Sequence, residues 1–123
     1  MIVVAKVGSS SITTEGGEID EDAIGKFCAE VVALRRAGHR VVMVTSGAIA
    51  AGLPALGLSA IRPRDAVTLQ AASAVGQSRL MRVYDEALAR GGLIGGQVLL
   101  APLDFMVRQQ YLHARSTLTR LLE

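Results

Sequence analysis

The sequence predicts an α/β fold in which helices cover a mostly parallel sheet. Two runs rich in Val, residues 1–7 and 40–44, lack the apolar–polar alternation of a half-exposed strand. Segments with helical spacing of apolar residues follow these runs. Half of the 123 residues are hydrophobic and only 3% are aromatic, so the core must consist of aliphatic side chains. These features are typical of one globular domain and exclude a disordered chain.

The first part of the chain predicts a strand, a loop and a helix, in that order. Residues 1–7 form a short buried strand that ends at Gly8. Polar residues 13–18, which include a Gly-Gly pair, predict a flexible loop. A helix follows, because Asp20 is a suitable N-cap and Gly38 a suitable terminator.

The rest of the chain predicts two more strands and three helices. A second buried strand, residues 40–44, leads into a short helix over residues 48–56. One long helix covers residues 65–90, a third strand covers 95–100, and a last helix covers 109–122. The order β-α-β-α-α-β-α predicts right-handed crossovers between parallel strands. Three strands make a narrow sheet, so we expect residues 1–123 to be the first part of a larger domain.

Charge and cysteine content argue against several classes of protein. With 13 basic and 11 acidic residues, a net charge of +2 and no basic stripe, we expect no nucleic-acid partner. No apolar run reaches the roughly 18 residues of a membrane span. The N-terminus also lacks the features of a signal peptide, so we expect no membrane contact and a cytoplasmic protein. The single cysteine, Cys28, excludes an internal disulfide and lies on the apolar face of a predicted helix, as an inert core residue would.

The loops after the strands are the candidate site, because ligands of open α/β sheets bind beyond the carboxyl ends of the strands. Lys6 ends the first strand, and the Gly-Ser-Ser sequence of residues 8–10 follows it. The second strand leads into Thr-Ser-Gly-Ala at residues 45–48, and the third into residues 101–104. Glycine lets the backbone approach an anion, hydroxyls add hydrogen bonds, and lysine supplies a compact charge. Together these residues predict a phosphate-binding cradle.

Simpler explanations of the same residues stay open at this point. A strand lysine is often an edge residue that reaches solvent, and Gly-Ser loops are often plain turns. The sequence contains neither a Walker-type loop nor a G-x-G-x-x-G loop after a strand. A serine triad at Ser46 is disfavoured, because only His39 and His113 could serve as its base and Asp104 is the sole acid after a strand.

Five segments together resemble the amino-acid kinase family. They are AKVGSS at 5–10, AGHRVVMVTSGAIAAG at 37–52, ASAVGQSRL at 72–80, GQVLL at 96–100, and the helix at 108–122. The resemblance covers nearly the whole chain and implies a three-layer α/β sandwich with a mostly parallel sheet. It implies that residues 1–123 are the N-terminal part of this domain and that the C-terminal, ATP-binding half lies outside this chain.

The resemblance implies phosphoryl transfer from ATP to the side-chain carboxylate of L-glutamate, the first step of proline biosynthesis. Lys6 would be the catalytic residue and would contact the ATP phosphates. The other residues that would line the phosphates and the transfer site are Gly8, Ser9 and Ser10. The residues that would bind L-glutamate are Ser46, Gly47 and Ala48. Mg²⁺ would accompany ATP, with ligands mostly in the missing half, so we expect no metal ligand in this chain.

The family further implies a homo-oligomer and feedback inhibition by proline. We expect the 123 residues alone to be inactive, because the adenine pocket would be missing. His113 stands where the family commonly has Asn, so no polar role is carried over to it. Two alternatives remain: a kinase of the same family that acts on acetylglutamate, aspartate or UMP, and a non-catalytic α/β assembly module. The small residues of segment 66–76 would support the second alternative, because they permit close helix packing at a subunit interface.

Overall fold

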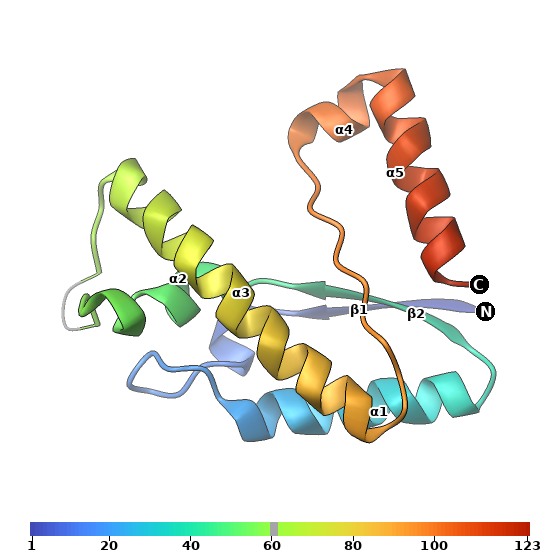
Figure 1. Ribbon diagram of the computed structural model, residues 1–123, viewed down its shortest axis with the longest axis horizontal. Coiled ribbons are helices and arrows are strands. Elements are labelled where there is room, and N and C mark those ends of the chain that lie inside the picture. The colour runs from blue at the N-terminus through green and yellow to red at the C-terminus, as the bar shows by residue number, and fades with distance from the viewer. Residues whose placement is uncertain (60–61) are drawn as a thin grey trace.

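The computed structural model describes residues 1–59 and 62–123, and these contain a two-stranded parallel sheet (Figure 1). Strand β1 (Ile2–Val7) pairs with β2 (Arg40–Thr45), in a register that runs from Ile2 opposite Arg40 to Val7 opposite Thr45. Both predicted strands and their parallel pairing are confirmed. The carboxyl ends of the two strands therefore lie at one edge of the sheet.

The helical segments of the described residues lie close to the predicted positions, except that η1 and α4 were not predicted. They are η1 (Ser9–Ser11), α1 (Glu21–Arg36), α2 (Ala48–Gly52), η2 (Pro54–Leu56), α3 (Ala66–Arg90), α4 (Pro102–Met106) and α5 (Arg108–Leu121). Asp20 caps α1 by accepting a 2.9 Å hydrogen bond from the Ala23 N–H, and Asp65 caps α3 in the same way through Thr68 at 2.8 Å. The helix predicted over residues 48–56 is divided in two, because Pro54 has no N–H to continue it.

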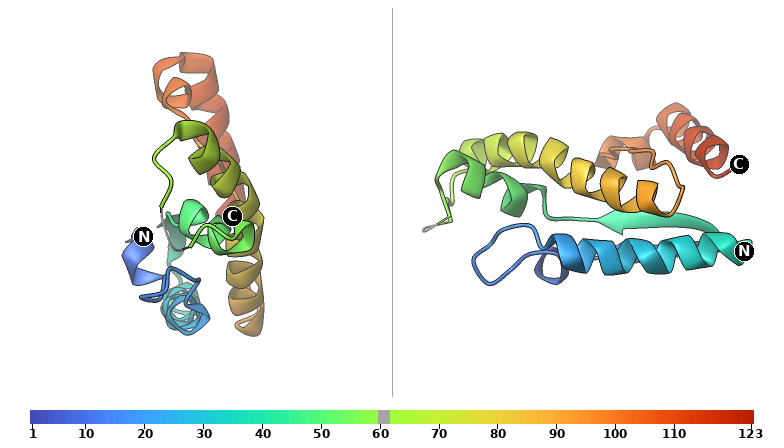
Figure 2. Two further views of the ribbon diagram at one scale, coloured as in Figure 1. Left: turned by 90° about the vertical axis from the view of Figure 1, so that its left-hand side faces the viewer. Right: turned by 60° about the horizontal axis from the view of Figure 1, so that its bottom comes forward.

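Helices α1 and α3 pack against each other and against one face of the sheet (Figure 2). Side chains alternate between the faces of a strand, and Val7, Val41 and Met43 point to the covered face. The core that they share with the helices is aliphatic apart from Cys28 and Tyr84 and includes Ile24, Val31, Leu80, Val83 and Leu88. On the other face of the sheet, Ile2, Val4 and Val44 are exposed.

The prediction of a third strand over residues 95–100 is wrong. This segment runs as extended backbone from α3 to α4 (Figure 1) and forms no ladder with any described residue. An apolar run predicts extended backbone, but a strand exists only where a neighbour supplies ladder hydrogen bonds. The residues beyond it start α4 instead, where the Asp104 carboxylate accepts a 2.6 Å hydrogen bond from the Ala101 N–H.

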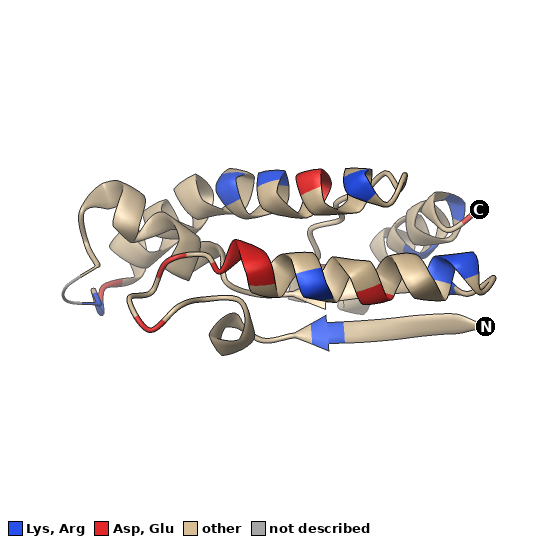
Figure 3. Cartoon of the chain, turned by 90° about the horizontal axis from the view of Figure 1, so that it is seen from below, with Lys and Arg blue, Asp and Glu red and all other residues tan. Residues whose placement is uncertain are grey.

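Helices α4 and α5 pack on each other and stand away from the sheet. The leucines of α5 are only partly covered: Leu118 is half-buried, while Leu112 and Leu121 are exposed. Acidic and basic residues are mixed along α1 and α3 (Figure 3). Within the described ranges, no helix combines the length and apolar character needed to cross a membrane.

Candidate functional site

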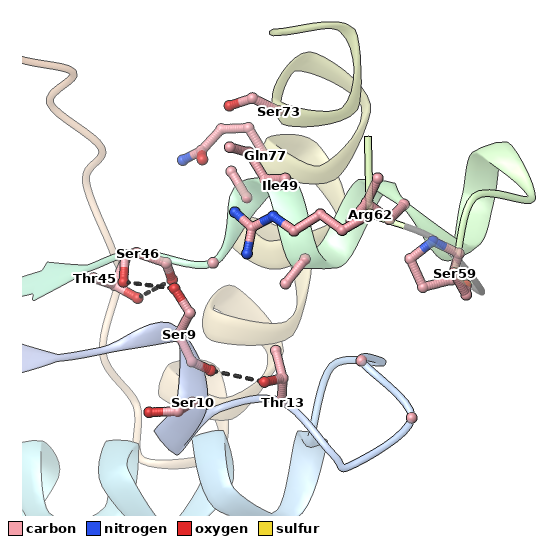
Figure 4. Close-up of a pocket in the computed structure, with 17 residues that line it drawn as sticks. Ser9, Ser10, Thr13, Thr45, Ser46, Ile49, Ser59, Arg62, Ser73 and Gln77 are labelled. Carbon is pink, nitrogen blue, oxygen red and sulfur yellow. Dashed lines mark hydrogen bonds between the residues drawn. The ribbon is translucent and has the colours of Figure 1, made fainter. Parts of the chain in front are cut away.

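The loops that follow β1 and β2 meet at the carboxyl edge of the sheet. The Ser46 N–H donates a 3.3 Å hydrogen bond to the Val7 carbonyl, which extends the strand pairing by one residue. Beyond it, the hydroxyl oxygens of Ser9 and Ser46 lie 3.1 Å apart, within hydrogen-bond distance (Figure 4). The predicted proximity of the two loops is therefore confirmed.

Gly47 makes the turn between β2 and α2. Its φ of 110° lies in the left-handed region, where a side chain is strained. A β-carbon there would also lie 3.0 Å from the Cδ1 atom of Ile12, a side chain that is only 1% exposed. The backbone of this loop thus passes directly over the core, and glycine is required at its turn.

A buried tyrosine connects the core to the second loop. The Thr45 hydroxyl donates a 3.1 Å hydrogen bond to the Ser46 carbonyl, and its oxygen lies 2.8 Å from the hydroxyl oxygen of Tyr84 on α3. Because the Thr45 hydroxyl has one proton, which it gives to Ser46, Tyr84 is the donor in the second bond. Burial raises the pKa of Tyr84, so its hydroxyl stays protonated as this role requires.

A pocket opens beside the paired hydroxyls, between the two loops, α2 and the first half of α3 (Figure 4). Five of the residues that line it were singled out from the sequence: Ser9, Ser10, Ser46, Gly47 and Ala48. The glycines of the loop after η1, Gly16 and Gly17, close one side of the pocket, and α3 contributes another side. The pocket therefore joins segments that are up to 68 positions apart in the sequence, from Ser9 to Gln77.

Lys6 and Gly8 do not line this pocket. Lys6 pairs with Val44 near the carboxyl end of β1, so it lies at the same end of the sheet as Ser46. By the alternation of the strand, its side chain shares the open face with Ile2 and Val4, opposite the helices. The structure thus places Lys6 at the predicted end of the sheet but outside the cavity that the serines line.

Five polar side chains of the pocket were missed by sequence reasoning: Thr13, Ser59, Arg62, Ser73 and Gln77. Ser73 and Gln77 lie four residues apart on α3, which puts them on one face of the helix. Two polar residues at that spacing in an otherwise small and apolar segment were a signal that could have been used. Arg62 lies in the connection between η2 and α3, and no pattern in the sequence distinguished it from the other arginines.

The pocket has a net positive lining. Among the described residues that line it, Arg62 is the single charged one, and none is Asp or Glu. The described part of the chain also contains no group of three or more His, Cys, Asp or Glu side chains arranged to hold a metal ion. Because Mg²⁺ prefers carboxylate and other oxygen ligands, these residues do not fit a magnesium site. Hydroxyls, small residues and one guanidinium fit an anionic organic ligand instead.

The whole chain, residues 1–123, matches the amino acid kinase family. It is 51% identical over 120 residues to proteins named glutamate 5-kinase from Burkholderia mallei (strain SAVP1) and Burkholderia pseudomallei (strain K96243). The identity to the protein of that name from Burkholderia thailandensis is 50%. Each alignment covers 98% of this chain and 32% of the relative, so the chain spans about a third of the length of these curated relatives. The parallel β1–β2 pair, the two loops at its carboxyl edge and the family match over every residue agree: this chain is a member of the amino acid kinase family.

Proposed function

We propose that this chain forms the acceptor-binding part of a glutamate 5-kinase. In the proposed reaction, a carboxylate oxygen of L-glutamate attacks the γ-phosphorus of ATP, the bond to the β-phosphate oxygen breaks, and glutamyl 5-phosphate and ADP form. This reaction would be the first step of proline biosynthesis. The observation that carries the proposal is the pocket at the carboxyl edge of the sheet, with its paired serine hydroxyls and its single, positive charge. The relatives named glutamate 5-kinase support the choice of acceptor.

The second loop is the proposed binding site of the acceptor. Ser46, Gly47 and Ala48 would bind L-glutamate, with the Ser46 hydroxyl as a hydrogen-bond donor to a carboxylate. A hydrogen bond to a charged group typically contributes about 1.5–3 kcal/mol. The bond between Ser9 and Ser46 holds this hydroxyl at the edge of the first loop, where the transfer would occur.

The first loop and the end of β1 are the proposed phosphate site, formed by Gly8, Ser9, Ser10 and Lys6. Phosphoryl transfer depends mainly on positioning and on stabilisation of charge. Lys6 faces the open side of the sheet, so a nucleotide that approaches from this side would meet its ammonium group. Lys6 would then neutralise charge on the phosphates while the Ser46 hydroxyl holds the acceptor.

The proposal also includes Mg²⁺, a homo-oligomer and inhibition by proline. Mg²⁺ would reach the site with the nucleotide, and the residues described here give it no ligand cluster. A homo-oligomer and inhibition by proline are also proposed, on the family resemblance alone. The assembly-module alternative loses the sequence feature that favoured it, because Ala72 and Gly76 pack against α2 of the same chain.

The test uses the full gene product that contains these residues. It is incubated with ATP, Mg²⁺ and, in turn, L-glutamate, N-acetylglutamate, aspartate or UMP. ADP release is measured together with hydroxamate formation, because hydroxylamine traps an acyl phosphate. We expect L-glutamate to give the highest kcat/KM, and proline to lower the rate. A tenfold preference for any other acceptor would contradict the proposal.

The 123-residue chain provides a second measurement of the same reaction. Because the adenine pocket would lie outside residues 1–123, we expect no glutamate-dependent ADP release from this chain in isolation. A rate equal to that of the full gene product would show that the division between acceptor and nucleotide sites is wrong.

A further inference from the structure

Arg62 is the residue of the pocket that no sequence feature pointed to. It lies ahead of α3, and its side chain extends from this connection over α2 (Figure 4). The guanidinium group points into the pocket, in the direction of Ser46 and Gln77. A long cationic side chain on the surface usually extends into solvent, so this inward direction requires an explanation.

Among the described residues, Arg62 forms no salt bridge. None of the residues that line the pocket is acidic. Among the described residues, the arginines whose side chains donate hydrogen bonds are Arg35 and Arg120, and those in salt bridges are Arg82 and Arg120. The guanidinium of Arg62 thus offers its donors to whatever occupies the pocket.

We propose that Arg62 binds the carboxylate of the acceptor that is not phosphorylated, and so selects an α-amino dicarboxylic acid. This inference rests on the proposed function. The paired hydroxyls of Ser9 and Ser46 mark the side of the pocket at which the strands end and the transfer would occur. The reacting carboxylate belongs on that side, and a dicarboxylic acid then presents its second carboxylate to the rest of the pocket.

A guanidinium group suits this task for geometric reasons. Its planar fork binds a carboxylate through two parallel hydrogen bonds, which fixes the orientation of the ligand as well as its charge. The side chain of Gln77 and the hydroxyl of Ser73 lie on the neighbouring face of α3 and line the same pocket. They can complete the hydrogen bonds of the second carboxylate or of the amino group.

The experiment compares two ligands that differ only at the second carboxylate. L-Glutamate carries it, whereas the α-carboxamide of glutamate has a neutral group there and keeps the side-chain carboxylate intact. The full gene product and its Arg62→Gln and Arg62→Lys variants are assayed with both ligands. The carboxamide is also measured as a competitive inhibitor against glutamate, so that its affinity is obtained as an inhibition constant even if it is phosphorylated slowly. Arg64→Gln is the matched control, because Arg64 is exposed, lies two residues away and does not line the pocket.

We expect Arg62→Gln to raise the KM for glutamate by 10- to 100-fold, with the KM for ATP unchanged. The same variant should bind the carboxamide as well as the unaltered protein does, so its preference for glutamate should collapse. The KM of Arg62→Lys for glutamate should lie between those of the unaltered protein and Arg62→Gln, because lysine keeps the positive charge but lacks the planar guanidinium. Arg64→Gln should change neither constant.

Three results would overturn the assignment of Arg62. An equal loss of affinity for both ligands would mean that Arg62 contacts the reacting carboxylate, and a change in the KM for ATP alone would place it on the nucleotide. No change in any constant would mean that it binds neither. Absence of glutamate-dependent turnover in the unaltered gene product is a different result, which would refute the proposed function itself and the substrate class with it.

Discussion

Gly52 and Gly76 face each other where α2 crosses α3, and neither position has room for a β-carbon. A β-carbon on Gly52 would collide with the carbonyl oxygen of Ala72, and one on Gly76 with the carbonyl oxygen of Ala48. Both obstacles are backbone atoms, which cannot rotate away. Ala48 begins α2, which lines the pocket. This crossing therefore fixes the second loop, which leads from β2 into α2, against α3.

We predict that Gly76→Ala destabilises the protein by about 3 kcal/mol, at the upper end of the usual cost of overpacking. Urea unfolding followed by circular dichroism measures the change. Gly25→Ala in α1 is the control, because a β-carbon there meets nothing within 4 Å. It should stabilise the protein by about 0.5–1 kcal/mol, since alanine is the better helix former. Equal effects of the two substitutions would contradict the close crossing.

Lys6→Ala should lower kcat and leave stability nearly unchanged. The side chain is exposed and makes no hydrogen bond or salt bridge with a described residue, so its loss removes no packing. A preorganised charge in phosphoryl transfer contributes about 2–4 kcal/mol to transition-state stabilisation, which corresponds to a reduction in kcat of about 30- to 1000-fold. Steady-state kinetics of the gene product test this, with Lys26→Ala on the exposed side of α1 as the control. A rate within threefold of the unaltered protein would remove Lys6 from the catalytic site.

Local signals in the sequence predicted the elements of this fold well. Asp20 caps α1 as predicted, Asp65 caps α3 where the long helix was predicted to begin, and the Val-rich runs pair in parallel as expected. Segment 95–100 was misassigned because a strand depends on its neighbour, which lies outside the local sequence. The residues of the site likewise divide into those set by the local sequence and those set by tertiary structure. Ser9 and Ser46 were predicted because they follow strands, whereas Arg62 reaches the pocket only through the tertiary path of its loop.

Ser46→Ala should chiefly weaken the binding of glutamate and leave the binding of ATP unchanged. Loss of one hydrogen bond to a carboxylate, about 1.5–3 kcal/mol, predicts a rise in the KM for glutamate of about 10- to 150-fold, with the KM for ATP unchanged. The effect of Ser9→Ala should be less than additive with it, because the two hydroxyls are bonded to each other. Ser78→Ala is the control, since Ser78 donates to the Val75 carbonyl on α3 and does not line the pocket. If Ser46→Ala alters only the ATP dependence, the second loop serves the nucleotide.

Tyr84 should make the protein less stable in alkaline solution. Burial raises its pKa in the folded state, so above the ordinary pKa of about 10 the unfolded chain loses a proton that the folded chain retains. The unfolded state then binds fewer protons, and the free energy of unfolding falls by up to about 1.4 kcal/mol per pH unit until the folded tyrosine also ionises. Below pH 9 this contribution is fully present.

Tyr84→Phe isolates this contribution, because it removes the titrating hydroxyl and keeps the ring. We expect the variant to lose about 1 kcal/mol at neutral pH, from the missing bond to Thr45. Its stability should then fall less steeply than that of the unaltered protein between pH 9.5 and 11, as measured by urea unfolding at each pH. Burial also raises the pKa of the Cys28 thiol, so a residual slope remains in the variant, and Cys28→Ala in the same background should remove it. Parallel stability curves for the unaltered protein and Tyr84→Phe between pH 9.5 and 11 would mean that burial in the core does not raise the pKa of Tyr84.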